Sequence, residues 1–419
     1  MARFHLMNLP YLTKTPGLGG ELKRRIEDFV VEELLEDGTP CEVEQLNKSP
    51  PLKIPLVIPP NPDPRKNDQL HVWMEKFNIE TTFAIRTLSR GTGGSVKRIG
   101  YAGLKDKRAL TCQRISIWKP DTQKLSRFSV KGLALHHASW SPNRIDLGML
   151  RGNRFTITIR DINLSEEEIR KRMDEFSSQI VQGLPNYFGE QRFGGYREIT
   201  HVVGKLLLQN KLEEAVMEYM CKESEGEQDD IQNARRNLRE TRDFARALKE
   251  FPDSAHFEIA MLNHLVTNGK DFAGAFQRLP QQTRYLFTHA YQSHVFNLVL
   301  SERIRRGLFY PIEGDMLENG AFTAPLPGIR TTMAKGIPGE IEQEIFTKEN
   351  ITPKFFANPH LGELASWGAR KPMVLHVHHF KLVAISDDLF FPGKKMVSVT
   401  FWLDKGNYAT IALRELMKN

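Results

Sequence analysis

Cysteine is scarce in this sequence of 419 residues, which contains only Cys41, Cys112 and Cys221. The three cysteines are odd in number and widely separated, so they form no CxxC pair that could hold a structural zinc ion. They suit a reducing compartment, and we expect the protein to be cytoplasmic. Because no sequence signal marks Cys112 as a nucleophile, we interpret it as a small buried hydrophobic residue.

Long apolar runs are also lacking. No segment approaches the roughly 18 apolar residues that a membrane-spanning helix needs, and residues 1–12 (MARFHLMNLPYL) lack a signal-peptide core. The glycine-rich stretch GTGGSVK, residues 91–97, does not have the G-x-x-x-x-G-K-[ST] spacing of a P-loop. The sequence therefore indicates neither a membrane protein nor a nucleoside-triphosphate cofactor, and a nucleophile elbow and a zinc-deaminase signature are missing as well.

Metal-ligand spacing is weak. His376 and His378 would share one face of a strand, next to His379, but no acidic residue or cysteine accompanies them nearby in the sequence. We therefore expect no metal site.

Positive charge is what the chain has in excess. Its 58 Lys and Arg residues outnumber 51 Asp and Glu residues, for a net charge of +7. A pI near 9.1 favours a polyanionic partner, and membrane headgroups would also fit that charge. With 40% hydrophobic and 26% charged residues, the chain has the composition of a globular protein long enough for two domains.

The basic charge concentrates around one aspartate in GYAGLKDKRALTCQ, residues 100–113. Between Arg86 and Arg114, eight Lys or Arg residues surround a single acid, Asp106. Nearby cations favour the ionised form of a carboxyl group, as a base-modifying enzyme acting on RNA would require. The alternative is a solvated basic face in which Asp106 is only a salt-bridge partner.

This segment resembles the catalytic motif of the TruD family of tRNA pseudouridine synthases, whose aspartate falls on Asp106. Four more segments resemble family motifs in the family's order, so that the resemblance spans nearly the whole chain: LKRRIEDFVVEE (22–33), RGNRFTITIRD (151–161), LPNYFGEQRFG (184–194) and FWLDKGNYATIALREL (401–416). The resemblance implies tRNA as the partner, the D-arm uridine at position 13 as the substrate, and a monomer without an obligate protein partner. The proline-rich segment and the overall length are similar to archaeal and eukaryotic-type relatives.

The resemblance also implies a set of pocket residues around Asp106, namely Lys23, Phe29, Asn153, Phe155 and Tyr408. The lysine would lie near the catalytic aspartate, and an aromatic wall with hydrogen-bond partners would receive the flipped base. For Phe29 and Phe155, the alternative is a place in the core.

Cations flanking Asp106 should bind the RNA backbone, and we expect Lys105, Lys107 and Arg108 to contact phosphates. In the segment LPNYFGEQRFG, the residues Asn186, Gln191, Arg192 and Phe193 would either bind RNA or fix a hinge.

Pseudouridine formation breaks an N-glycosidic bond, rotates the base and rejoins it through carbon. The route needs a carboxylate near the ribose, as nucleophile at the anomeric carbon or as base at the adjacent carbon, and no metal or redox cofactor. The sequence leaves both roles open for Asp106. The alternatives to this enzyme are a non-catalytic RNA-binding or RNA-folding protein and an aspartate-dependent nucleoside hydrolase.

Strands interleaved with helices predict an α+β fold. We expect a pseudouridine synthase catalytic domain with a mixed or antiparallel sheet and flanking helices, formed by residues 1–194 and 374–419. An inserted α+β domain, specific to the TruD family, would occupy residues 195–373. Alternation of apolar residues predicts strands at 28–33, 69–76, 113–118, 133–138, 154–160, 374–385 and 396–403.

Helical spacing predicts helices at 81–89, 165–182 with Ser165 as N-cap, 285–304 and from Asn407, and a helix-rich stretch at 200–250. Three segments should lack regular helices: a proline-rich irregular insertion at 37–68, a solvated acidic loop at 223–230, and short strands and turns at 307–373.

Overall fold

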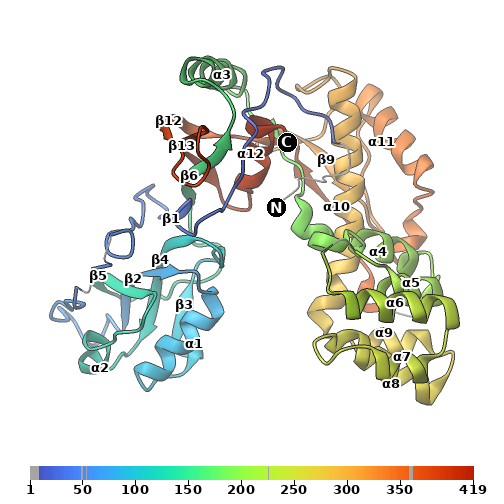
Figure 1. Cartoon of the computed structure of the whole chain (residues 1–419), viewed down its shortest axis with the longest axis horizontal. Coiled ribbons are helices and arrows are strands. Elements are labelled where there is room, and N and C mark those ends of the chain that lie inside the picture. The colour runs from blue at the N-terminus through green and yellow to red at the C-terminus, as the bar shows by residue number, and fades with distance from the viewer. Residues whose placement is uncertain (1–8, 49–50, 53, 225, 358–361) are drawn as a thin grey trace. The chain divides into compact units, whose positions relative to one another are not determined.

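The computed structural model describes residues 9–48, 51–52, 54–224, 226–357 and 362–419. The chain forms two compact units (Figure 1). Unit 1 contains Thr13–Leu184 and Leu375–Asn419, and unit 2 contains Pro185–Val374 together with residues 9–12.

Unit 1 is built on an eight-stranded sheet, counted over the described residues, in the order β12-β13-β6-β1-β4-β2-β5, with β3 paired to β4. The β1–β4 pair is parallel and the other neighbours are antiparallel, so the sheet is mixed, which confirms the predicted α+β class. The strands are β1 (Phe29–Leu34), β2 (Gln69–Phe77), β3 (Ile99–Tyr101), β4 (Leu110–Trp118), β5 (Leu133–Ser141), β6 (Gly152–Ile162), β12 (His378–Asp387) and β13 (Lys395–Asp404).

The register of the central strands places several side chains of interest on one face of this sheet. Glu33 of β1 lies opposite Asn153 of β6, and Val31 lies opposite Phe155. Phe401 of β13 lies opposite Phe155 on the other side. Because side chains directly opposite each other in paired strands point to the same face, these residues share one surface, which we call the site face.

In the described part of unit 1, four α-helices accompany the sheet: α1 (Thr81–Gly91), α2 (Thr122–Ser126), α3 (Glu166–Gln179) and α12 (Ala409–Met417). The Ser165 hydroxyl accepts a hydrogen bond from the Glu168 amide, so Ser165 caps α3 as predicted. The apolar residues Ile169, Met173 and Phe176 are buried along one face of α3. Local signals were therefore sufficient to define this helix.

Unit 2 is mainly helical and contains a three-stranded sheet in the order β10-β9-β8 within the described residues. In Figure 1, the long helix α10 runs beside α4, with which it packs. No helix in the described ranges is long and apolar enough to cross a membrane. The α-helices and sheet strands of unit 2 are α4 (Thr200–Leu208), α5 (Leu212–Cys221), α6 (Asp229–Thr241), α7 (Phe244–Glu250), α8 (His256–Asn268), α9 (Phe272–Gln277), α10 (Gln281–Arg305), β8 (Leu317–Glu318), β9 (Ala321–Leu326), α11 (Gly336–Lys348) and β10 (Ala369–Pro372).

Helix α11 corrects the expectation of short strands and turns between residues 307 and 373. Its proline and two glycines, Gly336, Pro338 and Gly339, all fall in the first turn. Proline is tolerated there because the first backbone N–H groups of a helix have no intrahelical partner. After that turn, Ile341 and Ile345 are buried four residues apart, as in a helix. This spacing would have predicted α11, but Pro338 and the two glycines drew the prediction towards turns.

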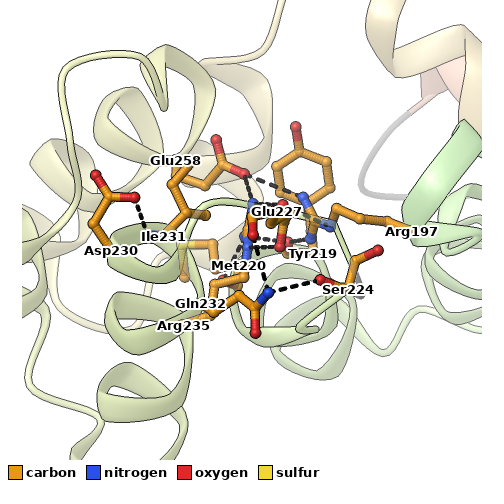
Figure 2. Close-up of polar contacts among 10 residues, drawn as sticks. All are labelled: Arg197, Tyr219, Met220, Ser224, Glu227, Asp230, Ile231, Gln232, Arg235 and Glu258. Atoms are coloured by element: carbon orange, nitrogen blue, oxygen red, sulfur yellow. Dashed lines mark hydrogen bonds and ion pairs between the residues drawn. The ribbon is translucent and has the colours of Figure 1, made fainter.

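The acidic segment 223–230 is not simply a solvated loop. Figure 2 shows Arg235 of α6 between two carboxylates, with its guanidinium 3.0 Å from Glu227 and 2.9 Å from Glu258. Arg197 also contacts Glu258, at 3.2 Å, and packs over the Tyr219 ring. One residue of the acidic segment, Glu227, thus pairs with a buried arginine eight residues further along the chain, and Glu258 completes the pairing from α8.

The boundary between the units differs from the sequence prediction on one side. The structure divides the chain after residues 184 and 374, whereas we expected the divisions after residues 194 and 373. The segment following residue 184 is hydrogen-bonded within unit 2: the amide of Asn186 donates to Met373 O, and the amide of Phe188 donates to Asn297 Oδ1. The chain crosses between the units within β7 (Leu184–Pro185) and β11 (Val374–Leu375).

Candidate active site

The loop that carries Asp106, residues 102–109, is fixed through its main chain. The ammonium of Lys76, a buried residue of β2, donates to the carbonyl of Asp106 at 2.6 Å and to that of Lys105 at 3.3 Å. The Thr81 hydroxyl, in the first turn of α1, accepts from the amide of Lys105 at 3.0 Å. The backbone at Asp106 is therefore held by two elements of unit 1, while its carboxylate remains 37% exposed.

Lys105 does not lie where the sequence predicted. Its ammonium is 2.7 Å from the carboxylate of Glu33, and the two side chains are only 3% and 0% exposed. A buried charge already paired in this way is not available to a phosphate, so the expected RNA contact by Lys105 is wrong. Lys107 and Arg108, by contrast, are exposed.

Lys23 lies beside Asp106, as the resemblance implied. Its Nζ is 3.5 Å from Asp106 Oδ1 and 3.9 Å from the centre of the Phe29 ring. The backbone of Lys23 has a φ of 56°, in the left-handed region that residues other than glycine seldom adopt. Such a conformation costs free energy and persists where the surrounding structure requires it, as is common at functional sites.

Aromatic rings form the floor beneath this ion pair. The Phe29 and Phe155 rings meet edge to face with centroids 6.2 Å apart, and Phe155 stacks on Phe401 at 5.5 Å. Phe29 and Phe401 are fully buried, and Phe155 is 5% exposed. These rings therefore belong to the core, and of the three Phe155 retains the most solvent contact.

Unpaired polar oxygens lie on the same face of the sheet. Among the described residues, Asn153 Oδ1, Thr111 Oγ1 and Gln113 Oε1 are buried and have no hydrogen-bond partner. Thr111 pairs with Val31 in the β1–β4 register, and Asn153 lies opposite Glu33, which places both on the site face; Gln113, two residues after Thr111 in β4, points the same way. Since buried polar atoms are nearly always hydrogen-bonded, these oxygens mark a position that a polar ligand could satisfy.

Tyr408 lies at the N-terminus of α12, just after the turn that follows β13. Its side chain is 40% exposed. The turn is tied to the start of β6 by a hydrogen bond from the amide of Lys405 to Arg151 O. Tyr408 therefore lies just beyond the end of β13, which is hydrogen-bonded to the start of β6, where Asn153 lies.

The electrostatics of the loop depend on Lys76. Burial lowers the pKa of Lys76 to about 8, although the nearby Asp106 carboxylate acts in the opposite direction. At neutral pH this ammonium is still largely charged and adds a second cation, behind the loop, to that of Lys23.

Replacing Lys76 with methionine, K76M, should remove a pH dependence of stability. The folded pKa of Lys76 is about 8, below the value of 10.5 for a free lysine. Between these values the unfolded chain binds more protons, so the wild-type free energy of unfolding should rise with pH relative to K76M, by on the order of 1–3 kcal/mol. Below pH about 8 the difference should be constant, since both states are protonated. Urea denaturation across this range measures it, and a difference that does not change between pH 8 and 10.5 would contradict the expectation.

Comparison with known proteins identifies the family. The model described as tRNA pseudouridine synthase D (TruD) matches residues 6–321 and 318–416 of this chain. The chain belongs to the TruD family. It is 36% identical to the probable tRNA pseudouridine synthase D of Methanococcoides burtonii, over 97% of this chain and 95% of that protein. The corresponding protein of Methanopyrus kandleri is 38% identical over 82% of this chain and 84% of its own length.

A solved TruD structure shares the fold. The crystal structure of the Methanosarcina mazei protein, described as a putative tRNA pseudouridine synthase D, superposes with a TM-score of 0.82 at 33% identity and covers 99% of both chains. The mixed sheet of unit 1 and the helical unit 2 are therefore the TruD fold.

In the TruD segment 184–194, some residues make structural contacts within unit 2 and others reach solvent. Asn186 is buried and donates from Nδ2 to Pro372 O at 3.1 Å, and Phe193 is buried against His201. Gln191 is exposed, and the guanidinium of Arg192 packs over the Phe188 ring at 5.4 Å. The first two residues thus have structural contacts, whereas Gln191 reaches solvent and Arg192 is half-buried.

Sequence reasoning missed three residues of the site: Glu33, Lys76 and Phe401. The signal for the first two was available, because each is a charged residue inside a strand of otherwise buried side chains. Charged residues are seldom fully buried unless they are paired. Phe401 lies in a TruD motif, but only the β13 register shows that it stacks on Phe155.

Two minor expectations also have outcomes. Cys112 is fully buried, as predicted, and burial raises its thiol pKa well above the ordinary value. His378 has an acidic neighbour in space that is 26 residues away in the sequence, since its Nε2 lies 3.0 Å from Asp404 Oδ2 across the β12–β13 pair.

Proposed function

We propose that this TruD-family pseudouridine synthase isomerises the D-arm uridine at position 13 of tRNA and that Asp106 is its catalytic residue. The observation that supports the proposal most directly is the Lys23–Asp106 pair, 3.5 Å apart. Asp106 lies on a loop whose main chain is fixed by Lys76, and the Lys23 ammonium lies over the Phe29 ring. An ionised, accessible carboxylate with a fixed main chain is what attack at a ribose requires.

Asp106 would act on the ribose in one of two ways. As a nucleophile, its carboxylate attacks the anomeric carbon while the bond to N1 of uracil breaks. As a base, it takes a proton from the adjacent carbon and the same bond breaks by elimination. In both routes the uracil then rotates and carbon 5 bonds to the anomeric carbon. In the first route this bond displaces the Asp106 carboxylate, and in the second the adjacent carbon takes back its proton. The proton on carbon 5 is lost and N1 gains one, which restores the aromatic base and the free carboxylate. Lys23 would orient the carboxylate, from which its ammonium lies 3.5 Å away.

The pocket residues would hold the flipped base. Extruding a base from its stack costs a few kcal/mol, which contacts in the pocket must offset. We assign the unpaired Oδ1 of Asn153 as an acceptor for the N3–H group of uracil. The Phe155 edge and the exposed Tyr408 ring would contact the face of the base.

The position is tested with two transcripts. Unmodified tRNA incubated with the full-length protein should gain a carbodiimide-reactive, primer-blocking residue at position 13. A transcript with cytidine at position 13 should gain none, if that uridine is the substrate. Modification at another position would overturn the assignment of position 13, free uracil would indicate a nucleoside hydrolase, and binding without a product would indicate an RNA-binding protein.

The exposed cations Lys107 and Arg108 should contact tRNA phosphates. If each side chain neutralises one phosphate, K107Q and R108Q should each lower the slope of log affinity against log salt by roughly 0.7–0.9. The slope is measured by fluorescence anisotropy with unmodified tRNA between about 50 and 200 mM KCl. Lys171, an exposed residue of α3, provides the control K171Q, which should keep the wild-type slope. If K107Q and R108Q match K171Q, these cations do not contact the RNA.

A further inference from the structure

A second cluster of polar side chains lies on the opposite face of the sheet from Asp106. It consists of Glu44, His136 and His137, each of which offers one metal-ligating atom, and these atoms all lie within 4.8 Å of one another. Glu75 and Lys76 are consecutive in β2 and so point to opposite faces. Lys76 contacts the Asp106 loop, whereas Glu75 contacts His136, so the cluster is separate from the active site.

A β-bulge brings the two histidines together. In the β2–β5 pair, His71 lies opposite Ser139 and Trp73 lies opposite His136, so Val72 faces two residues of β5. In a regular strand, His136 and His137 would point to opposite faces, but the bulge and the φ of 51° at His137 turn both rings to one side. Their ring centroids are 4.9 Å apart. A left-handed histidine is costly, and a bulge commonly re-aims a side chain at a functional position.

The buried His136 has one nitrogen without a hydrogen-bond partner. Its Nε2 lies 3.0 Å from the carboxylate of Glu75, which also accepts hydrogen bonds from the backbone amides of residues 44–46. Donation of the Nε2–H group to Glu75 leaves the lone pair on Nδ1. The His136 side chain is 9% exposed, and its Nδ1 makes no hydrogen bond to any described residue but lies 3.5 Å from Glu44 Oε2. A histidine oriented by a buried carboxylate, with its free nitrogen aimed at other ligands, is the usual arrangement at protein metal sites.

The donors lie close enough together to share one cation. Glu44 Oε1 is at hydrogen-bond distance, 2.8 Å, from His137 Nε2, a distance that must lengthen when both atoms bind an ion, and its Oε2 lies 3.5 Å from His136 Nδ1. Ligands placed 2.0–2.2 Å from a tetrahedral zinc ion are about 3.4 Å apart. Two imidazole nitrogens and one carboxylate favour Zn²⁺ over Ca²⁺ or Mg²⁺, which prefer oxygen ligands.

We propose that Glu44, His136 and His137 bind one Zn²⁺ ion, with Glu75 as the positioning residue for His136. Glu44 belongs to the proline-rich insertion, and both histidines belong to β5, the edge strand of the sheet. The ion would therefore tie the insertion to the edge of unit 1, which is a structural role. This proposal does not depend on the pseudouridine synthase activity.

Metal binding is tested on the full-length protein after removal of metal with a chelator. Titration with Zn²⁺ should show one bound ion per chain, and Co²⁺ should give the visible absorption bands of a tetrahedral site. E44Q and H137N alter side chains that are 44% and 50% exposed, and each should weaken Zn²⁺ binding by at least about 100-fold. E75Q should weaken it about 10- to 100-fold while the stoichiometry stays at one.

A matched control distinguishes this cluster from an ordinary histidine–carboxylate pair. H378N removes the His378–Asp404 pair, which has the same kind of contact at 3.0 Å, and should leave Zn²⁺ affinity unchanged. In the wild type, Zn²⁺ should also slow tryptic cleavage after Lys48, four residues beyond Glu44, and this protection should be absent in E44Q. If the wild type binds no Zn²⁺ or Co²⁺, or binds as tightly in E44Q and H137N, the proposal is wrong.

Discussion

Replacing Asp106 with asparagine, D106N, is expected to lower the rate of pseudouridine formation by at least about 1000-fold. The amide has nearly the shape of the carboxylate but is neither a nucleophile nor a base of useful strength. The main chain of residue 106 should stay in place, because Lys76 holds its carbonyl rather than its side chain. Affinity for tRNA should change by less than about threefold, since phosphate contacts supply most of it.

The rate is measured under single-turnover conditions with excess enzyme, which separates chemistry from binding and release. D174N is the control, because Asp174 is an exposed residue of α3, and it should retain the wild-type rate. A D106N rate close to the wild-type rate would disprove the assignment of Asp106. A decrease in tRNA binding that matched the decrease in rate would show that Asp106 acts in recognition rather than in chemistry.

Replacing Lys105 with methionine, K105M, should destabilise the protein by about 3–5 kcal/mol, because it leaves the carboxylate of Glu33 buried without its partner. It should also slow the reaction, since Lys105 is part of the loop that carries Asp106. The free energy of unfolding is measured by urea denaturation. K107M, two residues away on an exposed side chain, is the control and should change stability by less than about 0.5 kcal/mol.

A double variant separates charge burial from packing. In E33L/K105M both charges are gone, and much of the stability that K105M lacks should return. Suppose instead that K105M were as stable as the wild type and showed the same weakened, less salt-dependent tRNA binding as K107M. Lys105 would then be a phosphate contact, as its sequence neighbours suggested.

Regular elements were predictable where their signals are local. The strands at 69–76 and 396–403 and the helix capped by Ser165 agree with the structure within a few residues at each end. Each depends on apolar spacing and on a cap within a few residues. Helix α11 was missed because its glycines and proline were interpreted as helix-breaking residues. They break a helix in its interior, but in α11 they lie in the first turn, where they are tolerated.

The sequence indicated candidate residues for the site but not the side chains that surround them. A lone acid among cations indicated Asp106, and the family resemblance indicated Lys23, which the fold places 3.5 Å away. The burial of Lys105 was hidden, because Glu33 lies 72 residues earlier in the chain. The same limit hid the histidine cluster, since a bulge in β5 and a loop contribute its ligands.

By itself, the sequence determined the family, through motifs along the whole chain that resemble those of TruD proteins. It also determined the α+β class and indicated the basic segment around Asp106, because apolar spacing and neighbouring charges act over a few residues. Only the tertiary structure decided which cations around Asp106 reach solvent. Lys105 and Lys107 differ by two positions in the sequence, yet one is buried against a carboxylate and the other is exposed. Burial depends on contacts between distant segments, and desolvation makes a buried charge depend on its partner in a way that an exposed charge does not.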